Sequence, residues 1–118
     1  MVDIKPFVGE LIGEIVPVEL SYNDNFINPP AAVITETENR SEIIIGNHER
    51  VSRISVQLDI YAENALSLEE ISAQVSSILT LHGFKRSFSE VIYGEKYPRR
   101  CIRYDLGVDE ASGRIISL

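Results

Sequence analysis

Few residues of this chain have side chains that commonly bind metals or attack substrates. The sequence contains two histidines, His48 and His82, and one cysteine, Cys101. A structural zinc site usually needs four tetrahedral ligands at short characteristic spacings, and these three residues show no such spacing. A single cysteine also cannot form a disulfide within the chain. We therefore expect no metal and no cofactor, and we expect Cys101 to be a buried thiol.

A second possible source of chemistry is a group of acids near the C-terminus, formed by Asp105, Asp109 and Glu110. Paired carboxylates can act as a general acid and a general base. These acids, however, lie beside the sequence DEASG, whose composition is typical of a solvated turn. The chain also contains neither a glycine-rich phosphate loop nor a Gly-x-Ser-x-Gly sequence. The sequence therefore predicts a protein that is not an enzyme.

Charged residues are distributed unevenly along the chain, whose net charge is −7. Residues 1–49 contain nine acids against Lys5 and Arg40, whereas residues 85–103 contain six cations against two acids. An acidic and a basic region on one small domain favour head-to-tail contact between identical copies, as a closed ring requires. The alternative is that folding mixes these charges over the surface.

The basic segment 85–103 also contains three aromatic residues, Phe88, Tyr93 and Tyr97. Cations with interleaved aromatic rings are used to bind single-stranded nucleic acid. The same residue types are enriched at interfaces between proteins. The acidic net charge argues against a general binder of polyanions, because such proteins collect cations to displace counterions from phosphates. A protein partner and a nucleic-acid partner both remain open for this segment.

Two stretches have the pattern of amphipathic helices. Apolar residues recur at helical spacing from Ile4 to Val16 and predict a helix of about three turns, with Asp3 as its N-cap. A second helix is predicted to start at a capping box that runs from Ser67 to Glu70 and to stop at Gly83. Both helices need an apolar surface on which to pack.

The most regular strand pattern is RISVQLDIYAEN, residues 53–64. One face carries Ile54, Val56, Leu58 and Ile60, and the other carries Ser55, Gln57, Asp59 and Tyr61. We expect the apolar face to lie under the helices and the polar face to meet water or a partner. Further strands are predicted at 31–38, 84–92, 101–108 and 114–118, with a tight hairpin turn at Gly46-Asn47. Residues 1–118 therefore predict a single α+β domain with a largely antiparallel β-sheet, two α-helices packed on one face and a projecting hairpin.

Three consecutive isoleucines precede the predicted hairpin turn. Because neighbouring side chains of a strand alternate between its faces, at least one isoleucine is expected to be exposed unless a partner covers it. The alternative is that the run is central in the sheet. From charge and expected exposure, the candidate interface residues are Glu42, Ile43, Ile44, Ile45, His48, Arg50, Asp59, Tyr61, Arg99, Arg100 and Arg103.

The sequence contains no run of about 18 apolar residues, which is the length that a membrane span requires. The first residues, MVDIK, also lack the charged and then apolar layout of a signal peptide. We therefore expect a soluble protein that is not exported and does not contact membranes.

From Pro30 to Ile116 the chain resembles a known family. The stretches that carry the resemblance are PPAAVITE, RISVQLDIYAEN leading into a capped helix, and RRCIRYDLGVDEASGRI. In this order they resemble the small tail-terminator or head–tail joining proteins of tailed bacteriophages and prophages, which are also called tail completion or minor capsid proteins.

The resemblance implies a structural protein of the virion, assembled in the cytoplasm of the host bacterium and located where the tail meets the head. Members form a ring, usually a hexamer, that caps the tail tube, ends its polymerisation and faces the head connector or stopper protein. DNA passes through the lumen without specific binding, which an acidic lumen would favour. Two alternatives stay open: a small nucleic-acid-binding or regulatory module that uses residues 85–103, and another neck component such as a stopper.

Overall fold

The computed structural model describes residues 3–19, 28–46, 48–93 and 96–116, and within these it leaves out the side chains of Glu42, Ile43, His48 and Glu49. The described residues form two helices and a six-stranded sheet. The elements are α1 (Lys5–Ile12), β1 (Val18–Glu19), β2 (Ala31–Ile45), β3 (His48–Tyr61), α2 (Ala65–Leu81), β4 (Lys85–Tyr93), β5 (Pro98–Asp109) and β6 (Ile115–Ile116).

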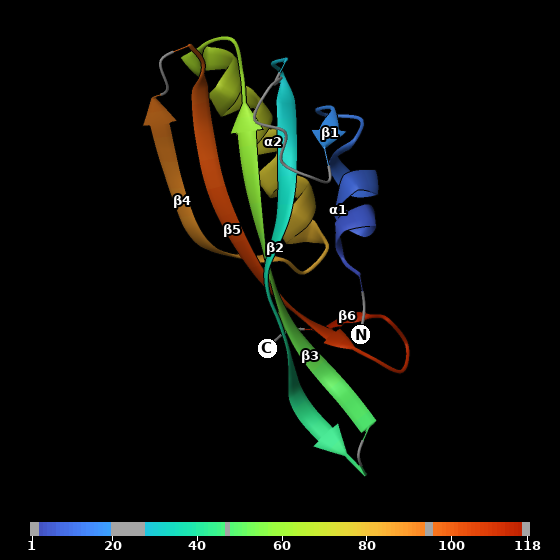
Figure 1. Cartoon of the computed structure of the whole chain (residues 1–118). Coiled ribbons are helices and arrows are strands. Elements are labelled where there is room, and N and C mark those ends of the chain that lie inside the picture. Colours follow the sequence, from blue (N-terminus) through green and yellow to red (C-terminus); the bar gives the residue numbers. More distant parts are fainter. Residues whose placement is uncertain (1–2, 20–27, 47, 94–95, 117–118) are drawn as a thin grey trace.

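The sheet has the strand order β1-β2-β3-β5-β4, and β6 pairs with the end of β5 (Figure 1). All of these pairs are antiparallel except β1 with β2, which is parallel. In Figure 1, α2 lies behind the central strands and α1 lies to the right of β2, below β1, and both helices pack into the same core. The predicted α+β fold with two helices on one face of a largely antiparallel sheet is confirmed.

The hydrophobic core lies between the helices and the sheet. Ile54, Val56, Leu58 and Ile60 of β3 are fully buried there, as the alternation in the sequence predicts. Each fully buried aliphatic side chain contributes about 1.5–3 kcal/mol relative to an exposed one. The helices and the neighbouring strands contribute Val8 and Ile12, Leu68, Val75 and Leu79, and Ile102, Tyr104, Leu106 and Val108.

The second helix does not begin where the capping box places it. Its N-cap is Asn64, whose extended backbone (φ −150°, ψ 169°) precedes the helix and whose Oδ1 accepts from the backbone N–H of Ser67 at 2.9 Å. Asparagine is as good an N-cap as serine, and Asn64 reaches Ser67 from the correct position before the first turn. Ser67 is therefore the third residue of the helix, and the predicted cap at Ser67 is wrong. The predicted stop at Gly83 is confirmed by its φ of +90°.

The first helix is shorter than its apolar pattern. It ends at Ile12, and the chain continues as turns in which the Ile12 carbonyl accepts from the N–H groups of Ile15 and Val16. Proline disfavours helical backbone in the residue before it, and Pro17 follows directly. Asp3 is not the N-cap, which is Ile4, but its side chain accepts from the backbone N–H of Lys5 at 3.3 Å.

The hairpin of β2 and β3 is longer than predicted. β2 continues past Glu38 to Ile45, which pairs with His48 across a turn that contains Gly46 at φ +56°. β3 pairs with β5 only from Val51 onward, so the end of the hairpin is a ribbon of two strands. Asn47, the other residue of the predicted turn, lies outside the described residues.

Candidate interaction surface

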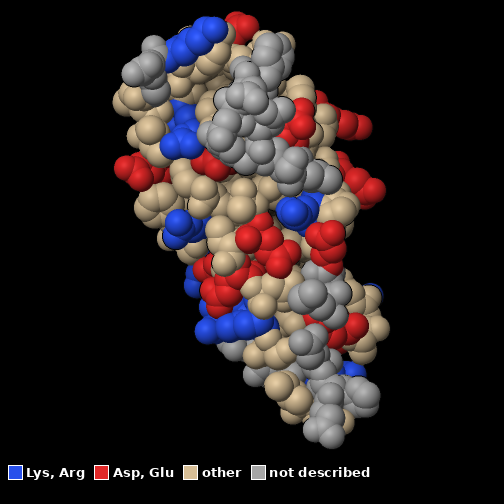
Figure 2. All heavy atoms as spheres, viewed as in Figure 1, with Lys and Arg blue, Asp and Glu red and all other residues tan. Residues whose placement is uncertain are grey.

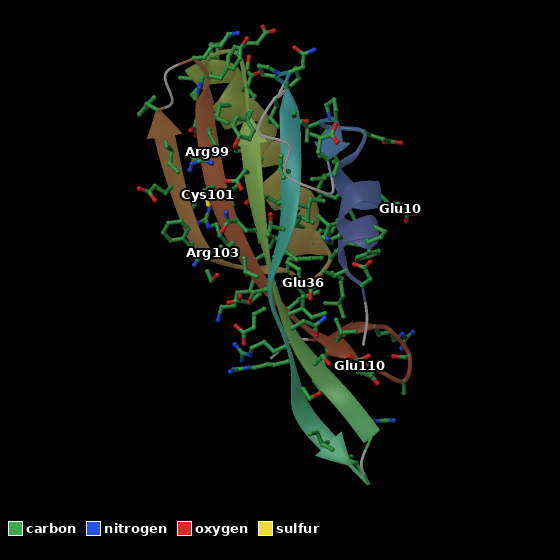
Figure 3. The ribbon with its side chains drawn as sticks, in the orientation of Figure 1. Glu10, Glu36, Arg99, Cys101, Arg103 and Glu110 are labelled. Atoms are coloured by element: carbon green, nitrogen blue, oxygen red, sulfur yellow. The ribbon has the colours of Figure 1, made fainter. Side chains whose placement is uncertain are left out.

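The face of the sheet opposite the helices, here called the open face, carries the polar residues of the RISVQLDIYAEN strand. Residues directly opposite each other in neighbouring strands share a face, and β5 therefore adds its own alternating set. The central members of the open face are Ser55, Gln57, Asp59 and Tyr61 of β3 and Arg99, Cys101, Arg103 and Asp105 of β5, with Phe88 of β4 beside Arg103. Figure 3 labels Arg99, Cys101 and Arg103 on this side.

Part of the open face is buried, contrary to the expectation that its β3 residues meet water or a partner. Asp59 is 5% exposed and Ser55 is 8% exposed, while Gln57 and Tyr61 are intermediate. Neighbouring side chains cover these two residues: Gln57 and Arg99 contact the Asp59 carboxylate, and Asp105, which lies opposite Ser55 in β5, accepts from the Ser55 hydroxyl. The sequence of one strand does not contain this information.

Arg99 connects two of the predicted interface residues. Its Nη1 lies 3.7 Å from Asp59 Oδ1 and donates to the Tyr61 hydroxyl at 3.4 Å. Its guanidinium carbon also lies 5.9 Å from the centre of the Tyr61 ring, within the range of a cation–π interaction. Arg99, Asp59 and Tyr61, which come from distant parts of the sequence, therefore form one cluster at the centre of the predicted surface.

Arg103 forms a second cluster with two residues that the sequence analysis did not select. Its Nε donates to Gln57 Oε1 at 3.2 Å, and its guanidinium carbon lies 5.5 Å from the centre of the Phe88 ring. Gln57 in turn donates from Nε2 to Asp59 Oδ2 at 3.1 Å, which joins the two clusters. Arg103 and Phe88 remain exposed, so this edge of the open face is available for contact.

Cys101 lies opposite Asp59 on the same face and is buried, as predicted. Burial raises the pKa of the Cys101 thiol, and the nearby Asp59 carboxylate raises it further by charge repulsion and by a hydrogen bond to the neutral thiol. The thiol is therefore protonated and unreactive near neutral pH. Its surroundings are those of a structural cysteine.

Arg100 lies on the opposite face from Arg99, although the sequence analysis grouped the two. Neighbouring residues of a strand point to opposite faces, and Arg100 pairs in register with the core residue Ile60. Its guanidinium is bonded to Glu69 of α2, and Nη1 donates to Ser89 at 2.9 Å. Arg100 therefore contacts the helix side of the molecule.

The end of the hairpin carries the other predicted interface residues. Ile44 and Ile45 are 64% and 62% exposed, so the expectation that at least one isoleucine is uncovered holds for the single chain. Arg50 is exposed as well. The side chains of Glu42, Ile43 and His48 are not among those that the structure describes. Large apolar side chains are unusual at the exposed tip of a two-stranded ribbon, and they favour contact with another protein.

The acidic and basic parts of the sequence lie toward opposite edges of the sheet. Exposed acids of the first part, Glu10, Glu14 and Glu19, are on α1, the turn after it and β1. The exposed charged residues of β4 are the cations Lys85 and Arg86 and one acid, Glu90. Figure 3 shows Glu10 on the α1 side of the molecule and Arg99 and Arg103 on the β4 side. In Figure 2, which views the open face, acids and cations nevertheless alternate over the middle of the molecule.

Both of these edges are incompletely paired. Among the described residues, β4 has no strand on its outer side, and β1 covers β2 only at Ala32 and Val33. A register shift between Arg86 and Phe88 interrupts the inner pairing of β4. The remaining backbone groups of such edges can pair with another chain.

Within the described residues, no group of histidine, cysteine and acidic side chains is arranged to hold a metal ion. In that same part of the chain, no helix is long and apolar enough to cross a membrane. Comparisons of the sequence with protein-family models and with curated proteins found no match. The function is therefore proposed from the fold, the surface and the resemblance described above.

Proposed function

We propose that this protein is a tail terminator of a tailed bacteriophage, a structural virion protein without catalytic activity. In this proposal, copies form a ring that caps the tail tube and joins it to the head connector or stopper protein. The ring is a hexamer, as the family resemblance implies, and it assembles in the host cytoplasm. DNA passes through its lumen without specific binding.

The observation that carries the proposal is the pair of unlike edges. An acidic edge near α1 and β1 and a basic edge at β4 lie on opposite sides of one sheet, and neither is fully paired within the described residues. Two different complementary surfaces on one subunit support head-to-tail contacts, which generate a ring when the rotation closes. A self-complementary patch would instead support a dimer.

The hairpin supports contact with a second protein. Ile44 and Ile45 offer an apolar end to the tail tube, while the acids of residues 1–49 disfavour adhesion of DNA. The basic segment 85–103 offers less to a nucleic acid than its composition indicates. Arg99 and Arg103 lie on the open face, whereas Arg100 is paired with Glu69 on the helix side.

The first test is the mass of the purified chain by light scattering, with and without a tail-tube protein from the same genome. The proposal expects a ring-sized species, alone or at the end of the tube. A monomer that ignores the tube but binds DNA, with an affinity that falls steeply with salt, would instead support the nucleic-acid module.

A pair of charge-reversed variants tests the head-to-tail arrangement. The first carries Lys85→Glu on β4 and Lys96→Glu at an exposed position just before β5, and so has two acidic edges. The second carries Glu10→Lys and Glu14→Lys and so has two basic edges. Neither variant is expected to assemble alone, because like charges meet at every contact, whereas their mixture is expected to form an alternating ring. Arg114→Glu, at an exposed turn residue, is the control for the change of charge. Assembly of each variant by itself would contradict the electrostatic part of the proposal.

A further inference from the structure

A cleft on the helix side of the molecule shares Arg86 with the basic edge, but its other residues have no role in the proposed ring contacts. It has a volume of about 210 Å³ and is lined by residues of α2, of the edge strand β4 and of its neighbour β5. Its polar lining includes Ser72 and Ser76 of α2, Arg86 and Ser89 of β4 and Arg100 of β5. Glu69 of α2 also lines the cleft and is its one carboxylate, so the two arginines and three serines supply more donors than Glu69 can accept from.

Two of these groups are buried without a partner. Among the described residues, Ser72 Oγ and Arg100 Nε are inaccessible to solvent and make no hydrogen bond. Ser72 is only 6% exposed as a whole residue. An unsatisfied buried polar group destabilises the fold, so natural structures usually supply it with a partner. Both residues line the cleft, and each carries a buried donor that no described residue accepts from.

Two side chains of the cleft, Arg100 and Ser76, are held in place by hydrogen bonds. The Arg100 guanidinium is fixed by Glu69 on one side and by Ser89, at 2.9 Å, on the other. The Ser76 hydroxyl is 2.7 Å from the hydroxyl of the buried Tyr104. Arg86 is exposed at the cleft and makes the charge of its lining positive, because Glu69 offsets only one of the two arginines. A fixed arginine and rigid hydroxyls are the arrangement that binds an oxyanion.

We propose that the cleft between α2, β4 and β5 binds a phosphate ion, with Ser72, Arg86 and Arg100 as its principal donors. Phosphate offers several acceptor oxygens, and it fits a cleft of this volume. Arg86 also belongs to the basic edge, but the residues of the site come from one chain, so phosphate is expected to bind to the monomer and the test does not require the ring.

The test is a ¹H–¹⁵N NMR titration of the full chain with sodium phosphate, with sodium chloride at matched ionic strength as the reference. We expect saturable shifts at the amides of Ser72 and Ser76 with a dissociation constant on the order of 1 mM, as a few charge-assisted hydrogen bonds provide. Ser72→Ala is expected to weaken binding about tenfold. Ser77→Ala, on the exposed side of the same helix, is expected to change nothing.

Glu69→Gln is expected to change the affinity for phosphate in the opposite direction from Ser72→Ala. The Glu69 carboxylate is bonded to Arg100 and repels an anion in the cleft, so its removal is expected to tighten phosphate binding by about tenfold. Shifts that do not saturate, equal binding by Ser72→Ala and Ser77→Ala, or weaker binding by Glu69→Gln would each overturn the proposal. Acetate that binds more tightly than phosphate would overturn the assignment to phosphate. Circular dichroism confirms that each variant is folded.

Discussion

Replacement of Asn64 by alanine tests how α2 begins. In the structure the Asn64 side chain accepts from the Ser67 N–H at 2.9 Å, so the variant leaves one donor of the first turn without its protein partner. Loss of an N-cap of this kind costs about 1 kcal/mol, within a range of about 0.5–2 kcal/mol. For a chain of 118 residues, the entropy of unfolding is about 0.25 kcal/mol per degree, so Tm is expected to fall by about 4 °C.

Ser67→Ala is the matched control, because the sequence pattern alone assigns the cap to Ser67. In the structure Ser67 is the third residue of the helix, where alanine has a better helix propensity than serine. Its free energy of unfolding is therefore expected to change by less than about 0.5 kcal/mol. Asn64→Ser keeps a capping oxygen and is expected to recover most of the lost stability.

The assay is urea denaturation followed by circular dichroism, with thermal melts as a second measurement. The three variants should rank with Asn64→Ala clearly the least stable. A larger loss of stability for Ser67→Ala than for Asn64→Ala would refute the N-cap at Asn64 and support the capping box that begins at Ser67.

Three further predictions concern other parts of the molecule. The pKa of the Cys101 thiol is raised in the folded chain, so this group stabilises the fold below pH 9.0, and the contribution is lost as the pH rises through the folded pKa. Urea denaturation at increasing pH should show this loss of stability. The loss should be smaller in Cys101→Ala. Gly83→Ala is expected to cost about 1–2 kcal/mol, because φ is +90° and the added Cβ would lie 3.0 Å from Ile115; an unchanged urea midpoint would contradict this. Ile44→Lys is expected to change the free energy of unfolding of the single chain by less than about 0.5 kcal/mol, because Ile44 is exposed. It is expected to abolish binding to the tail tube, as measured by co-sedimentation. Tube binding equal to that of the unaltered chain would contradict a contact through the hairpin.

Several features of the fold were predictable because their signals are local. The alternation of Ile54, Val56, Leu58 and Ile60 predicts a half-buried strand, and these residues are core residues. Gly46 and Gly83 predict a turn and a helix stop because glycine adopts positive φ at little cost. The class of the domain follows from the sum of such elements.

Other features depended on contacts between distant segments. β2 extends to Ile45 through the polar run TETENRSE because β3 pairs with most of it, across register shifts at Glu36/Glu38 and Ser41/Ile43, although that run has no apolar face of its own. Of the predicted interface residues, Asp59 is buried and Arg100 pairs with Glu69. Gln57 and Phe88, which contact Arg103, were not selected, since only the register between strands shows them as neighbours.

The sequence by itself determined the strand and helix patterns, the apolar faces, the lone thiol and the uneven charge along the chain. Each of these is a property of neighbouring residues or of composition. Only the tertiary structure decided that the acidic and basic segments lie toward opposite edges of the sheet, that the polar face of β3 is partly covered, and that serines and arginines from α2, β4 and β5 share one cleft. Strand order and register set these relations, and both result from packing across the whole chain.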